Sequence, residues 1–298
     1  MLLVLIMPRF PELRYLNLVK RILSKGTLQK TRNGNTYSLI GETMRFPLTH
    51  NELPLLTTKR VPWKTCLHEL LWFIRGQTDN NILLKDNVNI WSDNASRAFL
   101  DSRHLYHLEE NDLGPIYGHQ WRYFNAPYKT CHDTYKGMGV DQLENIISAL
   151  KNKKERYSRR LILSAWNPLQ INEMALPPCH TLAQFHVTEG DQLSCSLYQR
   201  SGDVGLGIPF NIASYSFLTH LIAHQCDLKP KEFIHFIGNA HIYDDHVDAL
   251  LKQIKRVPTA PPKLEINTHK ENIEEYKVEH FNVFGYKPAP LLKMNMRP

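Results

Sequence analysis

The sequence lacks the marks of several common protein classes. Its five cysteines are odd in number, widely spaced and without a CxxC pair, which argues against a disulfide framework and a thiolate zinc site. It has no internal repeat, no low-complexity segment and no long hydrophobic run, because the apolar start MLLVLIM has only seven residues before Pro8. We therefore expect a reducing, cytosolic compartment and no membrane segment.

The composition is that of an ordinary globular chain, with 42% hydrophobic and 22% charged residues among 298. The one proline-rich stretch, VPTAPPK at 257–263, is short enough to be a loop, so we expect a single domain over 1–298 with a loose extension over 1–9. A net charge of +7 indicates an affinity for nucleic acid or a phosphorylated small molecule, or merely a solvated surface.

Helical and strand periodicities mix along the chain without a regular βαβ rhythm, which predicts an α+β fold. The helix at 63–76 is apolar nearly all round and should therefore be buried. The predicted helices cover residues 12–24, 63–76, 140–152, 211–226 and 245–255, and the predicted strands cover residues 160–166, 181–187, 192–200, 232–243 and 263–266.

Two residues are candidates for chemistry on their local sequence alone. Cys179 lies in ALPPCHTL, between two predicted strands, although most free cysteines are buried and inert. Glu69 faces an apolar sector of the helix at 63–76, where burial would raise its pKa and suit proton transfer. A structural ion pair is an equally good interpretation of Glu69.

Further polar residues gather at the ends of predicted strands. Arginine suits phosphate because its planar fork donates two hydrogen bonds to one anion, and an asparagine amide can read a pyrimidine edge. These residues together predict a nucleotide site: Arg159, Arg160, Arg200, Ser201, Asp203, Asn211, His241 and Tyr243.

The sequence contains no glycine-rich phosphate-binding loop of the Walker or Rossmann type. His220 and His224 are four residues apart but lack an HExxH motif, so we interpret them as structural.

Five segments together resemble the thymidylate synthase family: LPPCH, LYQRSGDVGLGIPFNIASY, AHIYDDH, HELLWFIRG and DLGPIYGHQWR. The resemblance runs from about residue 10 to the C-terminus. It implies transfer of a one-carbon unit and a hydride from 5,10-methylenetetrahydrofolate to dUMP, giving dTMP and dihydrofolate without a metal. It also implies one large mixed β-sheet covered by helices, with the sheets of two subunits packed back to back in a homodimer.

The resemblance implies a role for each matched residue. Cys179 would attack C6 of the uracil ring, with Arg200 lowering the pKa of its thiol. The other implied catalytic residues are Glu69, Arg200, Asn211, Tyr117 and His180. The implied dUMP ligands are Arg32, Arg200, Ser201, Asp203, Asn211, His241 and Tyr243, with Arg159 and Arg160 donated by the partner subunit. The implied folate ligands are Ile90, Trp91, Asn94, Asp203, Leu206, Gly207 and Phe210.

The sequence departs from the family pattern at several places. The phosphate loop TRNGNTYSLIG is one residue shorter than the common form, so the assignment of Arg32 rather than Arg45 or Lys30 as the phosphate ligand rests on an alignment with a gap. Asn239 stands where aspartate is common, and Ala289 where a histidine between prolines is common. The tail KMNMRP ends in Arg297 and Pro298 instead of an aliphatic residue, so we expect an active enzyme with altered closure.

Two other functions remain open on the sequence. A dCMP hydroxymethylase uses the same thiol and folate, but an acidic residue would be expected at Asn211 because cytosine N4 is a donor. A protein that kept the fold while binding RNA is the second, and for an intact enzyme we expect only weak, salt-sensitive RNA binding. We expect no fused reductase domain in this chain.

Overall fold

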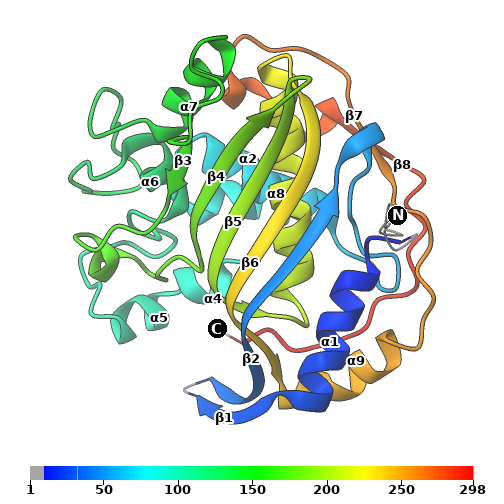
Figure 1. Cartoon of the computed structure of the whole chain (residues 1–298). Coiled ribbons are helices and arrows are strands. Elements are labelled where there is room, and N and C mark those ends of the chain that lie inside the picture. The colour runs from blue at the N-terminus through cyan, green and yellow to red at the C-terminus, as the bar shows by residue number, and fades with distance from the viewer. Residues whose placement is uncertain (1–9, 32, 298) are drawn as a thin grey trace.

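A computed structural model describes residues 10–31 and 33–297 of the chain. Its centre is a six-stranded sheet in the order β1-β2-β6-β5-β4-β3 (Figure 1). β5 and β6 run parallel and the other neighbours run antiparallel, so the prediction of an α+β fold with one large mixed sheet is confirmed. The strands are β1 Thr27–Thr31, β2 Gly34–Pro47, β3 Ile162–Ser164, β4 His180–Thr188, β5 Gln192–Asp203 and β6 Lys229–Tyr243, while β7 Lys263–Ile266 and β8 Phe281–Phe284 form a separate pair.

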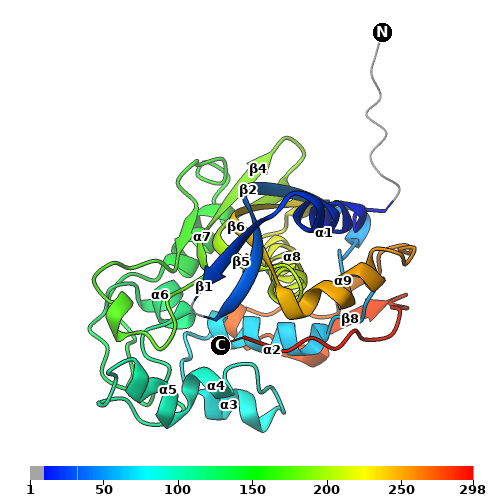
Figure 2. The ribbon, with the colours of Figure 1, turned by 90° about the horizontal axis from the view of Figure 1, so that it is seen from below.

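Helices cover one face of this sheet. α8 packs against β5 and β6, and α2 packs on the far side of α8, so that the three layers appear in order in Figure 2. The α-helices are α1 Leu13–Lys25, α2 Trp63–Ile74, α3 Asn80–Lys85, α4 Ser92–Ala95, α5 Arg97–Ser102, α6 Tyr117–Tyr123, α7 Gln142–Lys151, α8 Gly207–Gln225 and α9 Val247–Gln253. Because α2 and α8 lie inside the molecule, both are apolar nearly all round, as predicted for the helix at 63–76.

The structure corrects several predicted boundaries. α8 begins at Gly207, four residues before the predicted start at 211, and β3 keeps only three of the seven residues predicted for 160–166. The predicted helix at 245–255 begins with a 3-10 turn over Asp244–His246 and becomes α-helical only at Val247. β2 was not predicted, because its glycines interrupt the alternation, and its long antiparallel pairing with β6 stabilises it.

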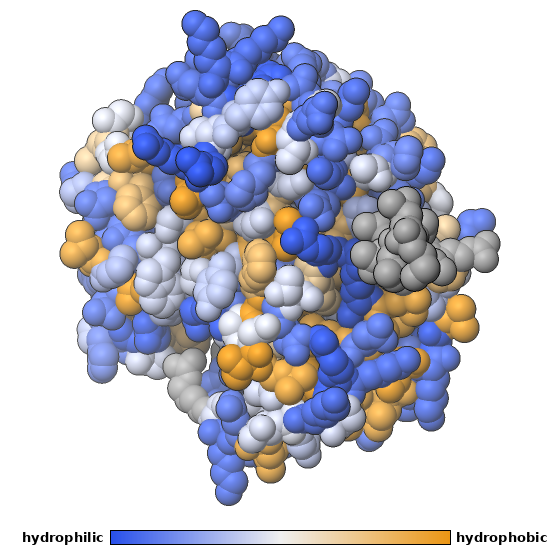
Figure 3. All heavy atoms as spheres, in the orientation of Figure 1, coloured by the Kyte–Doolittle hydropathy of each residue, from blue (hydrophilic) through white to orange (hydrophobic). Residues whose placement is uncertain are grey.

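Within residues 10–31 and 33–297, no helix lies over the other face of the sheet (Figure 1). Tyr198 of β5 pairs with Leu182 of β4 on one side and with Phe236 of β6 on the other, and all three side chains are exposed. Figure 3 shows apolar atoms scattered among polar ones over these strands. A row of exposed apolar side chains across three strands is unusual for a solvated sheet face.

No helix in the described part of the chain is long and apolar enough to span a bilayer. All five cysteines lie in that part and are free thiols, as expected from their number and spacing. The extension predicted over 1–9 lies outside the described residues.

Candidate active site

One cavity of about 600 Å³ collects most of the predicted site residues. Its walls come from α2, the C-terminal end of β5, the start of α8 and the tail of the chain. The predicted residues that line it are Glu69, Ile90, Trp91, Asn94, Tyr117, Cys179, His180, Arg200, Ser201, Asp203, Leu206, Gly207, Phe210, Asn211, His241 and Tyr243. Segments more than 170 residues apart in sequence therefore form one site.

Of the arginines predicted for the phosphate, only Arg200 is seen among the described residues that line the cavity, and the others, with the less favoured Arg45, lie as follows. Arg159 and Arg160 are exposed and do not line this cavity. Arg32 lies outside the described residues, although its neighbour Asn33 does line the cavity. Arg45 is engaged elsewhere, because its guanidinium pairs with Glu232 at 3.1 Å.

The loop that carries Cys179 is held from both sides. The Cys179 backbone N–H donates to the Tyr117 hydroxyl at 2.7 Å, and the Arg200 backbone N–H donates to the Cys179 carbonyl at 2.9 Å. The Arg200 guanidinium donates to the carbonyls of Pro178 and Pro177 at 2.8 and 2.9 Å. The two prolines thus stiffen the loop and supply the acceptors that bind Arg200 beside the thiol.

Two effects compete at the Cys179 thiol. Burial raises its pKa, and the positive charge of Arg200 lowers it, with burial the larger effect. Arg200 therefore acts in the predicted direction but does not bring the pKa below its ordinary value. His180 is neutral near pH 7, because burial lowers its pKa to about 4 despite a hydrogen bond to Asn211. It can orient neighbours but cannot add a positive charge next to Cys179.

Glu69 is buried among apolar side chains and lacks a basic partner among the described residues. Burial raises its pKa to about 7, although the indole N–H of Trp91 donates to the carboxylate at 2.8 Å and favours the charged form. The upward shift of its pKa agrees with the prediction, and no ion pair of Glu69 is found among the described residues. A carboxyl group that is half protonated near neutral pH suits proton transfer.

Asn211 is positioned by a buried chain of amide and imidazole groups that we did not predict. The Gln199 side-chain amide donates to the Asn211 side-chain oxygen at 3.0 Å, and the Gln199 oxygen is 2.8 Å from Nε2 of His235. Burial lowers the pKa of His235 to about 3, so this ring is a neutral donor. Since the Asn211 oxygen accepts from Gln199, the side-chain N–H groups of Asn211 remain as potential donors in the cavity that this residue lines. The only sequence feature that could have indicated this chain of groups was Gln199, a polar residue at an inward-facing position of β5.

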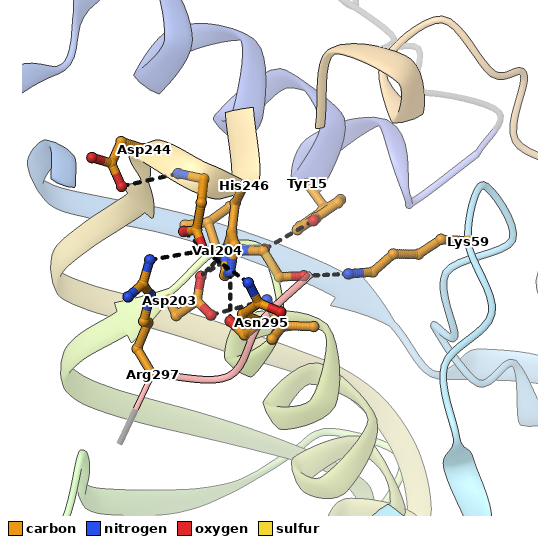
Figure 4. A network of polar contacts seen from close by, with 11 residues as sticks. Tyr15, Lys59, Asp203, Val204, Asp244, His246, Asn295 and Arg297 are labelled. Atoms are coloured by element: carbon orange, nitrogen blue, oxygen red, sulfur yellow. Dashed lines mark hydrogen bonds and ion pairs between the residues drawn. The ribbon is translucent and has the colours of Figure 1, made fainter. Parts of the chain in front are cut away.

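Asp203 anchors the turn between β5 and α8. Its carboxylate accepts from the backbone N–H groups of Gly205 and Leu206 at 2.8 and 3.2 Å, and lies 3.4 Å from Nδ1 of His246. The other ring nitrogen of His246 donates to the Asn295 carbonyl at 2.8 Å (Figure 4). Burial lowers the pKa of His246, but the contact with Asp203, the hydrogen bond to Asn295 and the charge of Asp245 together outweigh it, so the net shift is upward.

The C-terminal tail forms part of the cavity wall, to which it contributes Leu291, Leu292, Met296 and Arg297. The Arg297 guanidinium pairs with Asp245 at 2.8 Å and lies 6.0 Å from the centre of the Tyr243 ring. An ion pair thus joins the described end of the tail to the segment that follows β6, while Pro298 lies outside the described residues.

Two basic residues of the cavity escaped prediction. Lys59 and Arg60 line it just before the start of α2, and the Lys59 ammonium donates to the carbonyl of Gly205 (Figure 4). Burial lowers the pKa of Lys59 to about 8, against the attraction of Asp203. The sequence did contain a signal for them, because Lys59 and Arg60 are consecutive cations in TTKRVP, directly before a predicted buried helix.

His220 and His224 are structural, as predicted. Nε2 of His220 is 3.0 Å from the carbonyl of Glu52, and Nε2 of His224 is 2.8 Å from the carbonyl of Thr268. Each ring connects α8 to a loop that passes over it.

Known proteins match the chain along most of its length. Residues 13–297 match the family model described as thymidylate synthase. The chain is 52% identical over 292 residues to thymidylate synthase 1/2 of Encephalitozoon cuniculi, which covers 97% of this chain and 98% of that protein. It is 51% identical over 289 residues to the bifunctional dihydrofolate reductase-thymidylate synthase of Zea mays and 50% identical over 287 residues to that of Leishmania major. Those matches cover 97% and 96% of this chain but 55% of each bifunctional protein.

Proposed function

Because the chain belongs to the thymidylate synthase family, it is a methyltransferase that converts dUMP to dTMP, and we propose that Cys179 is its nucleophile. The observation that carries this proposal is the clamped loop, which directs the thiol into the cavity next to Arg200. The thiolate would form a bond to C6 of the uracil ring, and the electron pair of the C5–C6 double bond would move toward C5 and the O4 carbonyl.

Asn211 and Glu69 would assist this step in different ways, by stabilising the negative charge and by transferring protons. An N–H of Asn211 would donate to the uracil O4, where negative charge develops, because Gln199 holds the amide in that orientation. Glu69 would supply and remove protons, and Trp91 keeps its carboxyl group directed at the cavity. Tyr117 would hold the Cys179 backbone, and neutral His180 would support it.

The anionic and sugar groups of dUMP would lie at the rim formed by β5 and β6. Arg200 has five N–H donors, of which two positions serve the proline carbonyls, so others can reach a phosphate beside the hydroxyl of Ser201. Arg32 would reach the same phosphate. His241 and Tyr243 would bind the deoxyribose hydroxyl, and the Asn239 side chain lies 3.2 Å from the His241 ring and helps to orient it.

The remaining wall of the cavity fits a folate cosubstrate, as the family uses methylenetetrahydrofolate. Apolar side chains form that wall, namely Ile90, Trp91, Leu206 and Phe210, with Asn94, Gly207 and the carboxylate of Asp203 among them. Such a surface suits a flat aromatic ring with a few hydrogen-bonding groups. When bound, the folate supplies the methylene unit and the hydride. The protein's own residues orient the rings and exclude water.

We further propose that the chain works as a homodimer whose bare sheet faces pack back to back. The exposed row of Leu182, Tyr198 and Phe236 gives this face apolar surface to bury. Arg159 and Arg160 precede the edge strand β3, are exposed, and do not line the cavity of their own chain. They would therefore complete the phosphate site of the partner.

Subunit mixing tests the shared site. Cys179→Ser homodimers lack the nucleophile, and Arg159→Gln/Arg160→Gln homodimers should bind dUMP poorly. After exchange, a mixed dimer keeps one complete site, so activity should return to about a quarter of the wild-type value. A mixture no more active than its parents, although exchange is shown by mass spectrometry, would refute the donated arginines.

The nucleophile itself is tested by mass spectrometry after mixing the protein with 5-fluoro-dUMP and methylenetetrahydrofolate. We expect a covalent ternary adduct on the peptide with Cys179, present in a Cys131→Ser control and absent in Cys179→Ser. An adduct on another residue would overturn the assignment. Preferential turnover of dCMP would instead favour the hydroxymethylase.

A further inference from the structure

A second group of reactive side chains lies on the surface, outside the cavity. One ligand atom each of Asp79, Cys131 and His132 falls within 4.8 Å of the others. Asp79 is the residue before α3, whereas Cys131 and His132 belong to the loop between α6 and α7. Two segments about fifty residues apart thus bring a carboxylate, a thiol and an imidazole to one point.

We propose that this cluster binds a zinc ion through the carboxylate of Asp79, Sγ of Cys131 and Nε2 of His132. These three donor types are those that bind zinc in proteins. The site would be structural, because none of the three residues lines the catalytic cavity.

The observed spacing fits a shared tetrahedral ion. Sγ of Cys131 lies 3.7 Å from Nε2 of His132. Zinc bonds of about 2.3 Å to sulfur and about 2.0 Å to nitrogen, at a tetrahedral angle, place the two ligand atoms about 3.5 Å apart. The sulfur and nitrogen are therefore already close to the separation that one ion would require.

The surroundings supply a fourth ligand and a rigid support. Oε2 of Glu109 is 3.7 Å from Nε2 of His132 and belongs to an exposed side chain that can turn toward the ion. Asp112 is buried and accepts from the Cys131 backbone N–H at 2.9 Å and from the Tyr128 hydroxyl at 2.6 Å. The backbone of Cys131 is thus fixed before any ion binds.

The local charge also favours a cation. The carboxylates of Asp112, Asp79 and Glu109 all act on the Cys131 thiol. A divalent cation placed among them would relieve their mutual repulsion. It would also connect the loop before α7 to the start of α3, in the manner of other metal ions that join distant segments.

The other four thiols are poor competitors, which makes a clean experiment possible. Cys66, Cys195 and Cys226 are buried, and Cys179 stands beside the positive charge of Arg200. Replacing Cys179 by serine leaves Cys131 as the accessible thiol. Any metal–thiolate signal in that background would then report on the proposed site.

The test is a titration of purified, metal-free Cys179→Ser protein with Co²⁺, whose bonds to thiolates give an intense ultraviolet charge-transfer band. We expect a saturable band at one equivalent per chain, displaced by Zn²⁺ and lost in Cys179→Ser/Cys131→Ser. His132→Gln and Asp79→Asn should each weaken binding by about tenfold or more. His104→Gln is the matched control, since this exposed histidine contacts Tyr106 and lies outside the cluster.

Thermal unfolding provides a second measurement. Zn²⁺ should raise the melting temperature of the Cys179→Ser protein and leave that of Cys179→Ser/Cys131→Ser unchanged. The absence of a saturable band, or a band that survives Cys131→Ser, would overturn the proposal. So would a band seen in the wild-type protein and lost in Cys179→Ser, because the ion would then bind at the catalytic thiol.

Discussion

The chain contains two Cys-His pairs, and the fold places them in opposite surroundings. Cys179 and His180 lie in the cavity beside the cation of Arg200, whereas Cys131 and His132 lie on a surface loop among carboxylates. Partial burial and the neighbouring carboxylates raise the pKa of Cys131 to about 12, while Arg200 opposes the upward shift at Cys179. The same dipeptide therefore suits a nucleophile in one place and a metal site in the other.

The largest expected effect separates the two thiols directly. Cys179→Ser should lower kcat for dTMP formation by about 10⁴-fold or more, because the hydroxyl is a far weaker nucleophile than the thiolate. Cys131→Ser should change kcat/KM by no more than about twofold, as expected for a surface substitution. Absorbance assays of dihydrofolate formation measure the activity of both variants. Comparable losses of activity in the two would contradict the different roles assigned to Cys179 and Cys131.

The next effect concerns the buried acid on the Cys179 side. Glu69→Gln keeps an acceptor for the Trp91 indole but cannot transfer a proton, so kcat should fall by about 10²-fold. Equal kcat values for the variant and the wild type would exclude Glu69 from proton transfer.

The raised pKa of Glu69 should also make the free energy of unfolding depend on pH. Its pKa is about 7 in the folded protein and about 4.5 when unfolded, so the folded state binds the proton more tightly. The free energy of unfolding should therefore fall as pH rises from about 4.5 to about 7, by about 3 kcal/mol in total. Urea unfolding across this range should show a correspondingly weaker fall in Glu69→Gln, whereas the exposed control Glu189→Gln should follow the wild type.

A smaller effect is expected at Arg200. Arg200→Gln removes the positive charge beside Cys179, so the thiol pKa should rise and alkylation by iodoacetamide near pH 7 should slow by about tenfold. Peptide mass spectrometry follows Cys131 in the same sample as an internal control, and its rate should not change. Equal slowing at both thiols would show a general change in structure and not a local charge effect.

The smallest effect is expected at the tail. Arg297→Gln breaks the ion pair with Asp245 and should raise the KM for the folate by about two- to fivefold, because a partly exposed pair contributes little. The exposed neighbour Lys293→Gln does not line the cavity and serves as the control. An unchanged KM would show that the ion pair does not hold the tail closed.

Much of the site was visible in the sequence, because long motifs carried the resemblance and most of their residues do line one cavity. Gln199 and Lys59 were missed, since one glutamine in a strand and one lysine before a helix have no distinctive pattern. β2 was missed because pairing with β6, and not its own periodicity, stabilises it. The cluster of Asp79, Cys131 and His132 was missed because Asp79 lies about fifty residues before the other two along the chain.

The sequence by itself determined the fold class, the buried helices and the identity of the reactive groups, since these depend on residue type and local spacing. Only the tertiary structure decided which groups meet and in what electrostatic surroundings. It brought Arg200 onto the proline carbonyls before Cys179, and Asp79 and Asp112 around Cys131. The reason is physical: the pKa and reactivity of a side chain depend on burial and on charges within a few ångströms, which the folded chain alone brings together.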